Sequence, residues 1–166
     1  MFTWRSINKR SKYSKYYFVN IINLLKNQTL INTLLNYNIT LYFSLHHRVV
    51  EHKNKFQSII NLEYIKYIEE NEIAECLAKA NLIVTDFSSI IFDFIYRRKP
   101  FIIFIPDIYD PFIKQKYDKA TYDVIKKFQL NKFKFKNICF DIDKTVNKIK
   151  YYNILNMKNK NELFIL

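Results

Sequence analysis

The sequence predicts an α/β protein with a doubly wound, mostly parallel sheet that carries helices on both faces. Segments with apolar residues at helical spacing alternate along the chain with short apolar segments, of which residues 101–105 form the longest uninterrupted run. Strands buried on both faces read as continuous apolar runs, and the helices between them provide the crossovers of a parallel sheet. The 166 residues, 49% of them hydrophobic, suffice for one domain with its own core, and we expect a single domain over 1–166.

The first half of the chain is expected to contain two helices and two strands after a polar start. Residues 3–15 are polar and basic, which favours a loop that leaves a short strand at the very N-terminus. Residues 16–27 have apolar side chains at helical spacing, and residues 30–35 suggest a second, short helix. Residues 39–45 alternate and are rich in β-branched and aromatic side chains, as in a strand, and another short strand is expected within 61–68.

The second half alternates helix and strand. Residues 72–80 contain good helix formers, 82–84 form a short buried strand, and 85–87 form a turn. A helix is expected over 88–98, closed by the proline at position 100 because the residue before a proline disfavours helix. The remaining expectations are a strand at 101–105, a loop at 107–117, a helix at 119–128, a strand at 137–140 and a helix at 144–152.

Composition excludes several kinds of site. The chain has no glycine, so Gly-rich phosphate loops of the Walker or GxGxxG type cannot exist, and turns must rely on Asn, Asp and Pro. Cys76 and Cys139 stand in apolar contexts without ligand spacing, which predicts buried free thiols. His46, His47 and His52 lack suitably placed acids, so we expect no metal site and no cofactor.

The formal charge of +12 suggests anionic partners such as nucleic acid, anionic lipid headgroups or phosphorylated substrates. The basic charge flanks the chain, since the first acidic residue is Glu51. A compositional explanation stays open, because Lys is enriched together with Asn, Ile, Tyr and Phe. No recognised nucleic-acid module is present, and nucleic acid is not the expected partner. No apolar run approaches the length of a membrane span and no signal-peptide region is found, which predicts a cytoplasmic protein.

The strongest local signal for function lies in residues 82–94. A buried strand runs directly into Ser88 and Ser89 at the expected first turn of a helix, where free backbone N–H groups and the helix dipole favour an anion. Asp93, four residues beyond Ser89, could accept hydrogen bonds from a ribose or another hydroxyl group. The alternative is structural: Asp86 or Ser88 caps the helix, and Asp93 pairs with Arg97.

Three segments resemble motifs of the CDP-glycerol glycerophosphotransferase family, the enzymes that build teichoic acids and related capsular polymers. Residues 78–107 resemble its signature of a strand, TDYSS, two variable residues, FD, and a Lys-Pro pair before another strand. Residues 3–5 resemble the end of its PTWR motif, and residues 41–48 resemble its strand ending in KPHP. The matching residues are Thr3, Trp4, Arg5, His46, Thr85, Asp86, Ser88, Ser89, Phe92, Asp93, Lys99 and Pro100.

The resemblance implies the Rossmann-like, nucleotide-binding C-terminal half of a GT-B-type transferase, with the family's acceptor-binding N-terminal domain absent. It implies that polyol phosphate passes from CDP-glycerol, or a related CDP-polyol, to a growing teichoic-acid-like or capsular polymer with release of CMP. His46 would be the catalytic residue, donating a hydrogen bond to the diphosphate. The residues implied to bind the substrate are Thr3, Trp4, Arg5, His46, Ser88, Ser89 and Asp93.

Departures from the family pattern qualify this implication. Phe2 replaces a proline, and Ser44 and Leu45 replace the Lys and Pro that precede the family's histidine. A histidine proposed as the base for the acceptor hydroxyl belongs to the absent half, so we expect this chain alone to be inactive. Two alternatives stay open: a non-catalytic domain of the same fold, and a basic RNA-binding α/β protein. Family members work at the cytoplasmic membrane face, so peripheral contact is expected, although no amphipathic anchor is evident.

Overall fold

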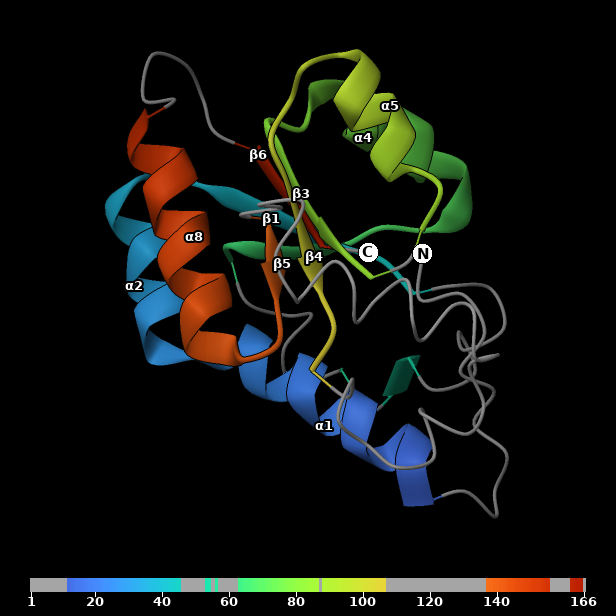
Figure 1. Cartoon of the computed structure of the whole chain (residues 1–166), viewed down its shortest axis with the longest axis vertical. Helices are drawn as coiled ribbons and strands as arrows, with labels where there is room; N and C mark the ends of the chain where they lie inside the picture. Colours follow the sequence, from blue (N-terminus) through green and yellow to red (C-terminus); the bar gives the residue numbers. More distant parts are fainter. Residues whose placement is uncertain are drawn as a thin grey trace, which may run out of the picture.

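The computed structural model describes residues 12–45, 53, 54, 56, 63–86, 88–106, 137–155 and 162–165 (Figure 1). Helices and strands alternate along most of this part of the chain. Their order is α1 (Lys12–Leu25), α2 (Gln28–Asn36), β1 (Thr40–Phe43), β2 (Ile65–Tyr67), the 3-10 helix η2 (Glu70–Glu72), α4 (Ile73–Lys79), β3 (Leu82–Thr85), α5 (Ile91–Tyr96), β4 (Phe101–Phe104), β5 (Ile138–Cys139), α8 (Ile142–Leu155) and β6 (Glu162–Ile165).

The strands form one six-stranded sheet in the order β2-β1-β6-β3-β4-β5. Every neighbouring pair is parallel, which confirms the predicted parallel α/β organisation. The register is given by the pairs Leu41–Ile65, Leu41–Leu163, Leu82–Leu163, Ile83–Phe101 and Ile103–Ile138.

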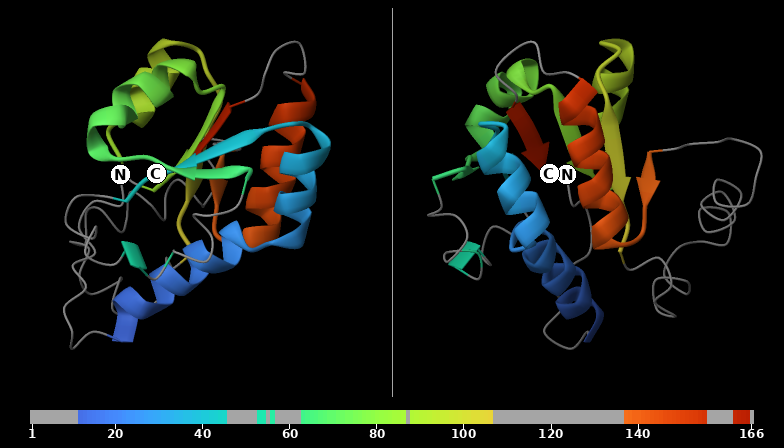
Figure 2. Two further views of the ribbon diagram at one scale, coloured as in Figure 1. Left: turned by 180° about the vertical axis from the view of Figure 1, so that it is seen from behind. Right: turned by 90° about the vertical axis from the view of Figure 1, so that its left-hand side faces the viewer.

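Helices cover both faces of the sheet, with α1, α2 and α8 on one face and α4 and α5 on the other (Figures 1 and 2). Strand β3 shows the alternation directly. Leu82 and Val84 belong to the larger hydrophobic cluster, on the face that α1, α2 and α8 cover. Ile83 points to the other face and packs with Phe94 of α5 in the smaller cluster. All four residues of β3 are buried, as a central strand of a two-sided sheet requires.

Most predicted elements lie within a few residues of an observed one, but three differ. Helix α1 begins at Lys12, inside the segment predicted to be a loop. The helix predicted over 88–98 is shorter, because α5 covers Ile91–Tyr96. Strand β6 was not predicted at all. The expected N-terminal strand, the loop at 107–117 and the helix at 119–128 lie outside the described residues.

The two cysteines differ in burial. Cys139 in β5 is fully buried, as predicted, and burial raises the pKa of its thiol. The prediction was wrong for Cys76, because α4 leaves this side chain half-buried. Its contacts are with the smaller cluster, so one side of the residue still faces the core.

Two helices end in a left-handed residue, although the chain has no glycine to adopt that conformation. Asn38 follows α2 with φ 49°, and Arg98 follows α5 with φ 53°. In each case the next N–H reaches back five residues: Ile39 donates to the Leu34 carbonyl at 2.8 Å and Lys99 to that of Phe94 at 2.8 Å. This is the Schellman end of a helix, in which glycine normally takes the left-handed position. Asparagine tolerates that conformation, whereas arginine is strained in it.

Replacing Arg98 by glycine should therefore stabilise the chain. We expect Arg98→Gly to raise the free energy of unfolding by about 0.5–1 kcal/mol, since relief of strain exceeds the added entropy of the unfolded chain. Urea denaturation followed by circular dichroism measures this change. The matched control is Arg97→Gly, at φ −80°, which should lower the free energy of unfolding. Equal effects of the two substitutions would contradict the strain at Arg98.

Candidate functional site

Polar residues gather where β1 and β3 end. Ser44 directly follows β1, and Thr85 ends β3 and is followed by Asp86. Because the strands are parallel, their carboxyl ends meet at one edge of the sheet, which is where α/β proteins bind ligands. All three residues are buried, and Ser88, just beyond, is only 4% exposed. Ser44 was not among the predicted site residues, and Asp86 was noted only as a helix cap and as part of the TDYSS-like motif.

The turn at Ser88 and Ser89 is built differently from the prediction. Backbone N–H groups at this helix start were expected to be free for an anion. Instead, Ile91 N–H donates to the Ser88 carbonyl at 3.3 Å, and Phe92 N–H to the Ser89 carbonyl at 3.0 Å. Ile90 N–H donates to the Ser88 hydroxyl at 3.4 Å. The N–H groups of Ile90, Ile91 and Phe92 are therefore not free, contrary to the expectation for these three positions. Ser89 is exposed, so its hydroxyl is the accessible polar group here.

Asp93 is exposed and lines a groove between α4 and α5 of 470 Å³. Leu77 and Phe94 contribute apolar surface to this groove, and Arg97 also lines it. Neither Ser88 nor Ser89 is among the described residues that line it. No ion pair joins the described side chains of Asp93 and Arg97, so the alternative in which Asp93 serves as a partner of Arg97 is wrong.

The Ser44 hydroxyl is the polar group of this edge that stands out. The side chain is 1% exposed, and its Oγ has no hydrogen-bond partner. The backbone is anchored, because Ser44 N–H donates to the Ile165 carbonyl of β6 at 3.2 Å. A buried hydroxyl without a partner costs free energy, so its presence at the strand end is consistent with a group held ready for a ligand.

The remaining predicted site residues lie outside the part of the chain that the structure describes. These residues are Thr3, Trp4, Arg5 and His46. Of the predicted donor site, the structure therefore describes Ser88, Ser89 and Asp93, which lie on one turn and the following helix. No group of three His, Cys, Asp or Glu side chains suited to a metal is found within the described residues.

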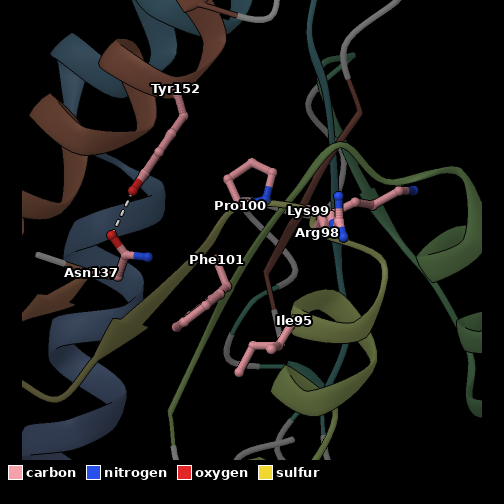
Figure 3. Close-up of a pocket in the computed structure, with 7 residues that line it drawn as sticks. All are labelled: Ile95, Arg98, Lys99, Pro100, Phe101, Asn137 and Tyr152. Atoms are coloured by element: carbon pink, nitrogen blue, oxygen red, sulfur yellow. Dashed lines mark hydrogen bonds between the residues drawn. The ribbon is translucent and has the colours of Figure 1, made fainter. Parts of the chain in front are cut away.

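A second cavity, of 450 Å³, lies at the opposite end of the sheet, where β4 and β5 begin (Figure 3). Tyr152 and Asn137 line this cavity, and the Tyr152 hydroxyl donates a hydrogen bond to Asn137 Oδ1 at 2.5 Å. Burial raises the pKa of Tyr152, so the hydroxyl keeps its proton and remains a donor. The described lining residues are Ile95, Arg98, Lys99, Pro100, Phe101, Asn137 and Tyr152.

Lys99, the lysine of the family signature, has a structural partner. Its ammonium donates to the carbonyls of Ala78 at 2.9 Å and Ala80 at 2.7 Å, at the end of α4. A cation at a helix C-terminus stabilises the carbonyl groups that have no partner within the helix. This contact ties α4 to the loop that leads into β4, on the side of the sheet away from Ser44.

Helix α5 carries an apolar stripe on its outer surface. Phe92 is 71% exposed, Tyr96 is 90% exposed, and Ile95 is also exposed. The spacing of three and four residues places these side chains on one face, opposite the buried Ile91 and Phe94. This exposed face was not predicted, because the same spacing of apolar residues is also typical of a buried helix face.

Comparison with known proteins decides the family. The sequence profile of CDP-glycerol:poly(glycerophosphate) glycerophosphotransferases matches residues 1–164. The chain belongs to this family. It is 27% identical over 165 residues to the minor teichoic acid biosynthesis protein GgaB of Bacillus subtilis, covering 96% of this chain and 16% of that protein. It is 32% identical over 111 residues to the teichoic acid poly(glycerol phosphate) polymerase of Bacillus spizizenii, covering 64% of this chain and 25% of that protein.

The chain thus spans a quarter or less of the length of these two relatives. No solved structure gives a significant match to it. Among the described residues, no helix has the length and the apolar character needed to cross a bilayer.

Replacing the unpartnered Ser44 hydroxyl should not destabilise the free chain. We expect Ser44→Ala to raise the free energy of unfolding by up to about 1 kcal/mol, because it removes a buried polar atom without a hydrogen bond. The matched control is Thr145→Val, since the buried Thr145 hydroxyl donates to the Asp141 carbonyl at 2.7 Å. The control should lose about 1 kcal/mol. Urea denaturation measures both, and a loss at Ser44 as large as that at Thr145 would show that Ser44 has a partner.

Proposed function

We propose that this chain is a donor-binding domain of a glycerophosphotransferase, which binds CDP-glycerol or a related CDP-polyol at the carboxyl edge of its sheet. The family match over residues 1–164 is the observation on which the proposal rests. The parallel sheet with helices on both faces supports a Rossmann-like C-terminal half of a GT-B-type transferase. We further propose that 1–166 is one nucleotide-binding domain.

In this proposal the hydroxyl groups at the strand ends hold the donor. Ser89 is exposed and can donate to a phosphate oxygen, and Ser88 supports the turn through its bond to Ile90 N–H. Asp93 accepts a hydrogen bond from a sugar or glycerol hydroxyl. His46, Thr3, Trp4 and Arg5 complete the proposed site. His46 donates a hydrogen bond to the diphosphate, and Arg5 contributes the positive charge that the phosphates need.

The proposed reaction is a phosphoryl transfer. A hydroxyl oxygen of the acceptor polymer attacks the β-phosphorus of the donor, the bond to the CMP oxygen breaks, and the hydroxyl proton passes to a base. The acceptor and the base would be held by a separate acceptor-binding domain. GgaB and the polymerase are much longer than this chain, which supports a division of labour between domains.

Donor binding is tested by isothermal titration of the purified chain with CDP-glycerol. We expect saturable binding, and we expect the Ser88→Ala, Ser89→Ala double variant to lose about 10- to 100-fold in affinity, the loss of one or two charge-assisted hydrogen bonds. The matched control is Gln28→Ala, which removes an exposed hydrogen bond to Asn32 on the far helix layer. Circular dichroism verifies that both variants remain folded.

The alternatives give different results in the same experiment. Titration with a short RNA should yield weak binding that salt abolishes and that the serine substitutions leave unchanged. RNA binding tighter than CDP-glycerol binding would favour the RNA-binding alternative. Donor binding without CMP release, even with polymer acceptor present, is expected for this chain alone. CMP release would show that the chain needs no separate acceptor-binding domain.

We also propose a peripheral membrane contact through the exposed stripe of α5, formed by Phe92, Ile95 and Tyr96. Arg97 and Arg98 follow the stripe directly, and both are exposed. Exposed aromatic side chains beside cationic ones suit the headgroup region of an anionic membrane. The formal charge of +12 acts in the same direction. Polymer synthesis at the cytoplasmic membrane face would then bring the donor site close to its acceptor.

Vesicle co-sedimentation tests this contact. The chain should bind vesicles that contain anionic phosphatidylglycerol more strongly than vesicles of phosphatidylcholine alone, and added salt should weaken the binding. The Phe92→Ser, Tyr96→Ser double variant should reduce the bound fraction several-fold, because it removes two of the three apolar side chains of the stripe. The matched control is Val19→Ser, an exposed apolar position on α1. An equal loss in variant and control would place the contact elsewhere.

A further inference from the structure

Strand β6 fills the space between β1 and β3, which do not pair with each other. On one side, Glu162–Ile165 of β6 pairs with Thr40–Phe43 of β1. On the other side, residues 163–165 pair with residues 82–84 of β3. Among the described strands, β6 is therefore the one that joins two blocks of the sheet, β2-β1 and β3-β4-β5, by strand pairing.

This strand comes last in the order of described elements, yet it lies in the middle of the sheet. It joins the rest of the fold through residues 156–161, which follow α8. A strand in such a position makes only long-range pairings, so both of its neighbours must lie in place before its ladders can form completely. The other described strands, together with α1, α2, α4, α5 and α8, all precede it.

The slot offers binding groups on all sides of an extended segment. Backbone groups of β1 and β3 flank it, and α4 packs against β6. Ile165 is fully buried within the larger cluster, so the slot also provides an apolar pocket for a side chain. Proteins that bind an added strand do so through strand edges that form backbone hydrogen bonds with it and through apolar pockets for its side chains.

We infer that the space between β1 and β3 is a strand-acceptor slot that holds β6 as an exchangeable segment, and that its occupancy sets the geometry of the donor site. Ser44 follows β1, whereas Asp86 and Ser88 follow β3, so β6 separates the two parts of the site by two strand spacings, about 10 Å. The Ser44 N–H bond to the Ile165 carbonyl fixes one part directly. The statement about the donor rests on the proposed function, whereas the exchange of the strand does not.

The test keeps the full chain and cuts it after folding. A protease site is placed within residues 156–161, and the folded protein is cleaved there. The fragment that contains β6 should remain bound during size-exclusion chromatography at high concentration and should dissociate on dilution. A fluorescent peptide of residues 161–166 should then enter the slot, with a rise in anisotropy. The same peptide with Leu163→Pro should not bind, because proline removes a ladder N–H in the middle of the strand.

CDP-glycerol titration of the cut protein gives the second readout. Donor affinity should fall at least tenfold when the fragment is removed and should return when the peptide is added. Unchanged circular dichroism, thermal midpoint and donor affinity after removal would overturn the inference, and so would failure of the peptide to bind. If the uncut chain does not bind CDP-glycerol, the proposed function fails. Peptide exchange, measured by anisotropy, still decides whether the slot accepts a strand.

Discussion

The two backbone ladders on either side of β6 are the interaction on which the rest of this structure depends. They unite two blocks of parallel strands into one sheet, and that sheet is the surface against which both helix layers pack. The larger cluster reaches from α1 to α8 and includes Ile165 of β6. The same ladders align the carboxyl ends of β1 and β3, so the burial of the core and the position of the candidate site have one cause.

A second constraint is the lack of glycine. Two of the described helices, α2 and α5, end in a left-handed residue, and this chain places Asn38 and Arg98 there. Phosphate sites in many α/β proteins use glycine to bring the backbone close to the ligand. Here the N–H groups of Ile90, Ile91 and Phe92 are occupied by local hydrogen bonds. In the donor site we propose, side-chain hydroxyls therefore take the place of a glycine-rich turn, and the backbone would lie further from the phosphate.

Local patterns predicted the elements whose apolar periodicity is complete within a few residues. Strand β3 is an example, because its four buried residues read as a core strand without knowledge of its neighbours. Strand β6 is the opposite case: its four residues follow a polar segment, and long-range pairing decides their conformation. The start of α5 was misjudged because hydrogen bonds to the carbonyls three residues earlier form a tight turn before the helix. Ser88 and Ser89 were predicted from the local strand-to-helix pattern and then from the family motif, whereas Ser44 was identified only from its burial in the structure.

Charge and hydrogen bonding have separate roles in the donor site we propose. The residues that directly follow β1 and β3 provide hydroxyls and the carboxylate of Asp86, and no Lys, Arg or His is among residues 44, 45, 86 and 88–90. A diphosphate held there needs compensating positive charge. The chain as a whole is strongly basic, and its first 50 residues contain no acid. A field of this kind raises the rate at which an anion arrives but does not select its position. The position of the diphosphate has to be fixed by the short-range hydrogen-bond donors at the strand ends. The alignment of β1 and β3 by β6 therefore matters more to the proposed site than the number of basic residues.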